Sequence, residues 1–163
     1  MGSIIRAVHN IGLAVWWGGT VMGTLALNPA VEVLDDPEER GKMVDEGWAR
    51  FQPYGAAGLA TAVVTHVALR RRPPAVVSCR YKNVARLQDL LMLGAFVSSI
   101  ASMALGEYVT HQDFDAPPSD EGGDDFAEGA GQITLASWVQ LLSGIGLFLT
   151  GAILSKEREK IAN

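Results

Sequence analysis

The chain has 163 residues, the usual size of a single domain, and 48% of them are hydrophobic. Its 13 basic and 18 acidic residues give a net charge of −5, but they occur in blocks separated by long uncharged stretches. This distribution excludes an ordinary soluble helical bundle, whose exposed helix faces carry a charge every turn or two.

The uncharged stretches have the length of membrane-spanning helices. A hydrocarbon core about 30 Å thick requires roughly 20 apolar helical residues, and four stretches without Asp, Glu, Lys or Arg reach or approach that length: 7–31, 51–69, 90–106 and 129–155. We therefore predict an all-α fold in which residues 1–163 form one integral membrane domain, a four-transmembrane-helix bundle. The predicted spans cover residues 4–27, 51–69, 86–108 and 132–154.

The charged segments between these spans indicate an orientation. Residues 70–85 contain Arg and Lys but no acid, whereas residues 109–131 contain acids but no base. Because Lys and Arg are retained on the cytoplasmic side, we expect loop 70–85 inside and loop 109–131 outside. Both termini then face the cytoplasm of a multi-pass protein in the cell inner (plasma) membrane. Cys79, the single cysteine, lies in the basic loop, which suits a reducing compartment.

Small residues in the first two spans favour close helix packing. Gly19 and Gly23 in the first span are four residues apart, and Gly55 and Gly58 lie in the second. Such residues let helix backbones approach closely, within one bundle or between two copies. Between the two spans, residues 32–50 are polar and acidic, and we expect a short surface helix there.

The outer loop 109–131 is rich in Pro, Gly and acids, and is predicted to be solvated and disordered. A Ca²⁺ site is the alternative, although the ligand spacing of an EF-hand is missing. His111 beside Asp113 and Asp115 is at best a weak metal site. Membrane lipids are expected partners, since basic juxtamembrane residues favour anionic headgroups. A second copy of the chain or a larger membrane complex is the other expected partner. No nucleic-acid partner is indicated.

Three ionisable residues lie inside the predicted spans, where such groups are costly and mark candidate sites. His9, His66 and Asp89 each lie a few residues from the cytoplasmic boundary, so alternating helix directions bring them to one depth. Four interpretations remain open: polar groups satisfied by their neighbours with no cofactor, a metal site of all three residues, one b-type haem between the two histidines, or a proton relay.

The sequence contains no catalytic signature. It has no Walker A, GxGxxG, GxSxG, HExxH or CxxC pattern, and no nucleophile–base pair can be nominated as catalytic. We therefore expect a non-enzymatic membrane scaffold or accessory subunit that assists the movement of a small solute or ion. The alternative is a redox subunit that carries one haem or a metal at His9 and His66.

Residues 11–54 also carry a family resemblance. Its motifs are Trp17-Gly18-Gly19, Asn28-Pro29-Ala30, Arg40-Gly41 and Trp48-x-x-Phe51-Gln52-Pro53-Tyr54. This part of the chain resembles a small four-helix membrane domain family of unknown function related to animal transmembrane protein 205. The resemblance implies a four-helix membrane fold but no established chemistry. The fourth span of that family often opens with histidine and serine, whereas Trp138 stands in that region here.

Overall fold

The computed structural model describes residues 2–71, 77–115 and 122–162, with side chains described except at positions 2, 37–38, 107–115, 122–131 and 161–162. The described residues form helices and short turns and include no strand, which confirms the all-α class. They make up four long helical segments. The first combines α1 (Gly2–Met22), the π-helical turn η1 (Gly23–Leu27), α2 (Asn28–Ala30) and the 3₁₀ turn η2 (Val31–Val33), and the others are α3 (Pro37–Arg70), α4 (Cys79–Asp115) and α5 (Gly122–Ala162).

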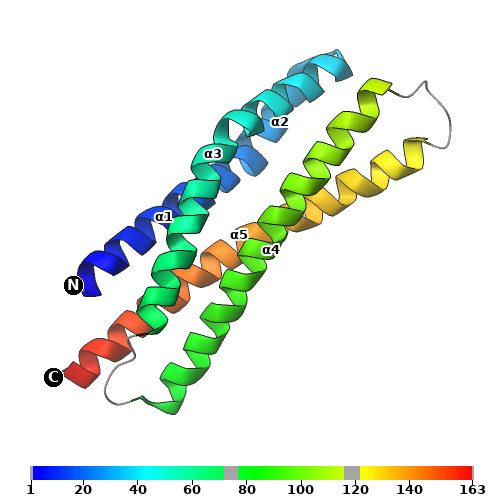
Figure 1. Cartoon of the computed structure of the whole chain (residues 1–163). Helices are drawn as coiled ribbons and strands as arrows, with labels where there is room; N and C mark the ends of the chain where they lie inside the picture. The colour runs from blue at the N-terminus through cyan, green and yellow to red at the C-terminus, as the bar shows by residue number, and fades with distance from the viewer. Residues whose placement is uncertain (1, 72–76, 116–121, 163) are drawn as a thin grey trace.

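The four segments alternate in direction. Figure 1 shows both termini at the end of the molecule where α3 stops and α4 starts, whereas α4 stops and α5 starts at the opposite end. The helix ends that flank residues 72–76, within the basic segment 70–85, therefore lie beside the two termini. The charge pattern predicts this arrangement, in which both termini lie at the same end as the basic segment 70–85.

The helices are longer than the predicted spans. Residues 37–50, expected within a separate surface helix, are instead the start of α3, which runs unbroken through Pro53. At the other end of the bundle, α4 and α5 extend into the predicted loop 109–131. No glycine or proline interrupts residues 107–115, and Pro117 is the first helix breaker beyond them. A helix continues in such a segment because each added residue gains a backbone hydrogen bond. The side chains of His111, Asp113 and Asp115 lie outside the described side chains.

The helices associate as two pairs, with α1 along α3 and α4 along α5 (Figure 1). The first pair crosses at Gly12 and Gly58. A Cβ atom on Gly12 would lie 2.7 Å from the carbonyl oxygen of Gly58, and one on Gly58 would lie 2.9 Å from the carbonyl oxygen of Gly12. The two backbones are thus in direct contact, which only glycine permits at this crossing.

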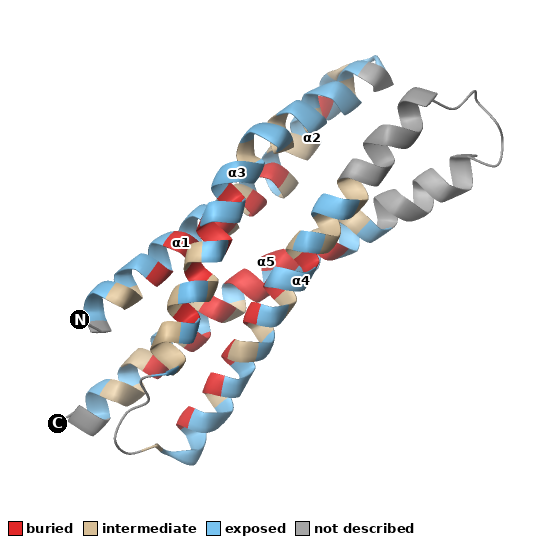
Figure 2. Ribbon diagram, viewed as in Figure 1, coloured by how far each residue is buried: buried red, intermediate tan, exposed pale blue. Residues whose placement is uncertain are grey.

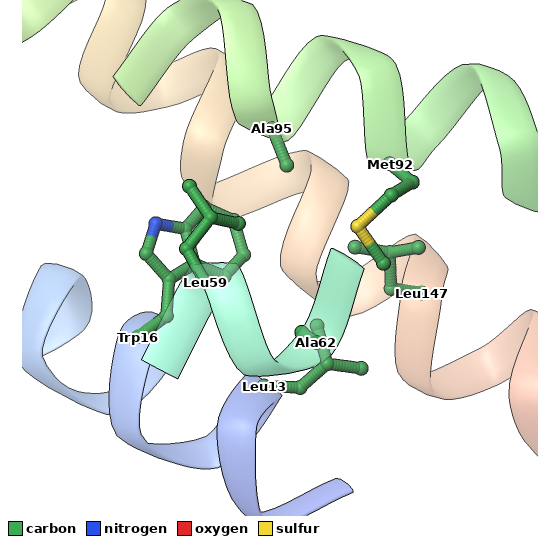
Figure 3. Packing of buried hydrophobic residues seen from close by; sticks show 7 residues of the cluster. All are labelled: Leu13, Trp16, Leu59, Ala62, Met92, Ala95 and Leu147. Atoms are coloured by element: carbon green, nitrogen blue, oxygen red, sulfur yellow. The ribbon is translucent and has the colours of Figure 1, made fainter. Parts of the chain in front are cut away.

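The glycines singled out in the sequence also lie along this pair. Gly19 of α1 and Gly55 of α3 both face the ring of Phe51, and Gly23 faces the ring of Trp48. The helix that packs on Gly19 and Gly23 is therefore α3 of the same chain. The two pairs meet mainly through α1 and α5, around a core cluster drawn from all four long helices (Figure 3). The cluster consists of Leu13, Trp16, Leu59, Ala62, Met92, Ala95 and Leu147.

Eight of the described polar residues lie inside the bundle beside the apolar core, whereas many large apolar side chains are exposed. Figure 2 marks the buried and exposed residues along each helix. The buried polar residues are His9, Thr20, His66, Gln88, Ser98, Gln140, Ser143 and Thr150. Two helical stretches, Cys79–Gly106 of α4 and Gln132–Lys160 of α5, are long and apolar enough to cross a membrane.

Candidate functional site

The two histidines of the predicted spans converge inside the bundle. His9 of α1 and His66 of α3 are both buried, and their ring centroids lie 6.0 Å apart with 33° between the ring planes. They meet because the nearby glycine crossing brings the α1 and α3 backbones together one to two turns away. Both side chains therefore face the interior of the bundle.

His9 is anchored to α3 through Nδ1. This atom lies 3.0 Å from the carbonyl oxygen of Ala62 and 3.1 Å from Oγ1 of Thr65, whose hydroxyl donates to the carbonyl oxygen of Thr61. Because a carbonyl oxygen can only accept, Nδ1 of His9 carries a proton and donates it. Nε2 of a neutral ring then keeps a lone pair, and this atom makes no hydrogen bond within the described part of the chain.

His66 belongs to a bridge between the two helix pairs. Its Nε2 lies 2.8 Å from Oδ1 of Asp89 on α4, and the second oxygen, Oδ2, accepts a hydrogen bond of 2.6 Å from Arg70. Both carboxylate oxygens therefore have a partner, although 43% of the Asp89 side chain remains exposed. A carboxylate placed between a guanidinium and an imidazole reduces the cost of a charge near a bilayer. The partner is Arg70, not Arg86, the neighbour that sequence spacing favours.

A cavity of about 400 Å³ opens beside this bridge, at the end of the bundle that carries both termini. Three arginines line it near the helix ends: Arg6 of α1, Arg70 of α3 and Arg158 of α5. Among the described residues Arg6 has no ion-pair or hydrogen-bond partner, whereas Arg158 donates to the hydroxyl of Tyr81 at 2.9 Å. Further polar lining comes from His9, Asn10, His66, Gln88 and Ser155, and apolar lining from Leu69, Leu147, Phe148, Ala152 and Leu154.

The residues do not fit a haem between His9 and His66. A porphyrin ligated by both histidines needs an open slot between the helices that carry them. Here the α1 and α3 backbones touch at Gly12, and Nε2 of His66 is engaged by Asp89. The described residues also include no group of three His, Cys, Asp or Glu side chains placed to hold one metal ion. The metal site of His9, His66 and Asp89 gains no support and stays a prediction.

Sequence reasoning missed the arginines and Tyr81 as part of this site. Arg6 precedes His9 and Asn10 by three and four residues, a spacing that places all three on one helix face. That spacing could have linked Arg6 to the histidine layer, but the charge pattern connects the basic residues with topology and lipid headgroups and not with the histidines. Tyr81 and Arg158 are 77 residues apart, and no local pattern predicts their contact.

A second polar contact zone lies further along the bundle. Gln140 of α5 donates to the carbonyl oxygen of Ser98 at 3.2 Å and to the hydroxyl of Ser102 at 2.9 Å, both on α4. Trp16 of α1 donates to Ser99 at 3.1 Å. These bonds satisfy buried polar groups and hold helices together, as interhelical hydrogen bonds do in membranes.

No protein-family model, curated protein or solved structure matches the chain. The resemblance of residues 11–54 to the family related to transmembrane protein 205 therefore stays a prediction.

Proposed function

We propose that this chain is a non-enzymatic, four-helix integral membrane protein. In this role it is a scaffold or accessory subunit that assists the movement of a small solute or ion. The observation that carries the membrane part is the outward-facing apolar surface of the helices. Large apolar side chains face outward on all four long helices, whereas the interior holds an apolar core together with histidine, glutamine, serine and threonine.

Exposed apolar area of this kind is unfavourable in water, at about 25 cal/mol for each Å². On α1 the outward residues include Ile4, Ile11 and Met22, each at least 60% exposed. Only 17% of the apolar stretch of α4 is buried, so most of that stretch needs an apolar surrounding. Lipid supplies that surrounding. In this proposal α1 and α3 cross the membrane together with α4 and α5, the two helices that are long and apolar enough by themselves.

The orientation that we propose places both termini and the basic residues 70–85 in the cytoplasm, in the inner (plasma) membrane of the cell. The charge asymmetry supports it, because positive residues gather at the end that carries the termini. The cavity opens at this same end. A solute bound there would therefore come from the cytoplasm or from the cytoplasmic leaflet.

A binding role fits the side chains better than a catalytic one. The hydroxyls of half-buried Thr65 and of buried Ser98 and Thr150 donate to carbonyl oxygens of their own helices. The Thr65 hydroxyl does lie 3.1 Å from His9, but it faces the protonated Nδ1, which cannot act as its base. Among the described residues, the hydroxyls of Ser98 and Thr150 bond only to backbone carbonyl oxygens. What the site offers is fixed hydrogen-bond donors around a space of ligand size.

Cysteine labelling tests the topology. Cys79 is exposed, so an impermeant maleimide should label it only after the cells are lysed. As a matched control, Met43→Cys in a Cys79→Ser background places the thiol at an exposed position of α3 near the opposite end, and it should label in intact cells. Labelling of Cys79 in intact cells, or release of the protein from membranes by an alkaline wash, would overturn the proposal.

A further inference from the structure

We propose that the cavity at the cytoplasmic end binds a phosphate-bearing anion, held by Arg6 and Arg158. The anion is the headgroup of a lipid or a free phosphate compound, and the shared chemistry is the phosphate oxygens. This inference rests on the proposed function, because it takes this end of the bundle to lie at the cytoplasmic membrane surface.

The first argument is uncompensated charge. Of the three arginines that line the cavity, only Arg70 has a carboxylate partner, Asp89. Arg158 bonds to a neutral phenol, and Arg6 has no partner among the described residues. Glu157 lies beside Lys160 at 3.4 Å and Arg80 at 3.8 Å, and it is not part of the lining. Two guanidinium groups thus line a partly enclosed space, and no described carboxylate lines it with them. A bound anion would stabilise these two positive charges.

The second argument is the kind of donor. A guanidinium presents a planar fork of N–H groups that matches two oxygens of one phosphate. The Tyr81 hydroxyl uses its oxygen to accept from Arg158, so its hydrogen is free to donate into the cavity. Gln88 and Asn10 line the same space and add amide donors. The lining is therefore rich in donors, as a group with several acceptor oxygens requires.

The third argument is size and wall composition. A volume of about 400 Å³ is far more than a single small ion fills and lies in the range of ordinary ligand pockets. Leu147, Phe148 and Leu154 form an apolar wall beside the arginines. The site thus suits a molecule with an anionic head and a less polar body. Basic pockets between transmembrane helices at the cytoplasmic surface bind anionic headgroups in this manner.

The experiment measures binding by the full chain purified in detergent. One arm adds phosphatidylglycerol or phosphatidylcholine and follows lipid retention by native mass spectrometry, and the other titrates pyrophosphate by calorimetry. The test variants are Arg6→Gln and Arg158→Gln. The controls are Arg71→Gln and Lys156→Gln, which remove the same charge from exposed positions at the same end, outside the lining.

We expect Arg6→Gln and Arg158→Gln each to weaken binding about tenfold or more, because each variant loses one charged hydrogen bond to the ligand. The control variants should change the affinity less than about twofold. Retention of phosphatidylglycerol over phosphatidylcholine identifies a lipid headgroup, and binding of pyrophosphate alone identifies a soluble phosphate compound. If the controls weaken binding as much as the test variants, or if neither ligand binds, the inference is wrong.

Thermal unfolding of each variant separates binding from folding. Arg6 has no described partner to lose, so its variant keeps the test valid even if Arg158→Gln unfolds. A protein that stays in the membrane and folds, yet binds neither ligand, contradicts this inference alone. A protein that leaves the membrane on alkaline washing contradicts the proposed function itself.

Discussion

Replacing Gly12 by alanine should force α1 and α3 apart. The new Cβ would lie 2.7 Å from the carbonyl oxygen of Gly58 and 3.0 Å from the backbone nitrogen of Ala62. Ordinary van der Waals contact begins at 3.4 Å, so the helices must separate by the difference, about 0.7 Å at this crossing. The bond from His9 to Ala62, now 3.0 Å, lies one turn away and would lengthen beyond hydrogen-bonding range.

The magnitude combines two opposing effects. Overpacking a close contact costs about 1–3 kcal/mol, whereas exchanging a helical glycine for alanine gains about 0.5–1 kcal/mol. The net expectation for Gly12→Ala is a loss of up to about 2.5 kcal/mol in the free energy of unfolding, centred on about 1 kcal/mol. Gly18→Ala is the matched control, because nothing lies within 4 Å of a Cβ at that position of the same helix.

Reversible unfolding in mixed micelles of denaturing and mild detergent provides the assay. The difference between the two variants isolates the strain at the crossing, since both make the same chemical exchange in α1. Equal stability of Gly12→Ala and Gly18→Ala would refute the direct backbone contact. So would a Gly12→Ala variant that is more stable than the original chain.

Three further predictions concern the polar groups. A double-mutant cycle of Arg70→Gln and Asp89→Asn, measured by thermal unfolding, should give a coupling energy of about 1 kcal/mol. The coupling is this small because both side chains are partly exposed to solvent. Additive effects of the two substitutions would contradict the bridge. Gln140→Leu should cost about 0.6–1.7 kcal/mol by loss of its two bonds to α4, and an unchanged unfolding midpoint would count against them. The purified protein should show no Soret band, whereas a band that vanishes in His9→Ala and His66→Ala would restore the haem alternative.

The helical class and the depth of the polar layer were predictable from the sequence, because both follow from local distances along the chain. Uncharged stretches mark the apolar parts of the four helices, and a rise of 1.5 Å per residue places His9, His66 and Asp89 at one level. Side-chain direction was not predictable for Asp89. Its choice of Arg70 over Arg86 depends on how α3 and α4 face each other across the bundle.

The helix limits were predicted less well because apolar length and helix length are separate properties. Residues 37–50 are polar yet helical, and they extend α3 well beyond its uncharged part. Hydropathy locates the part of a helix suited to lipid, whereas α3 and α4 continue past that part and end a few residues before Pro73 and Pro117. The contact of Tyr81 with Arg158 depends on tertiary structure alone, since the helices that carry them are joined at the far end of the bundle.

The pairing of helices also bears on how the protein is made. Each tight pair, α1 with α3 and α4 with α5, consists of segments that follow one another along the chain. Because a ribosome delivers the N-terminal pair first, that hairpin can close at its glycine crossing while the second is still being synthesised. The second hairpin then docks as a unit, and the cavity and the Asp89 bridge form only at that last step. Two fragments divided between Arg71 and Val77, co-expressed in one cell, should therefore recombine into the complete bundle.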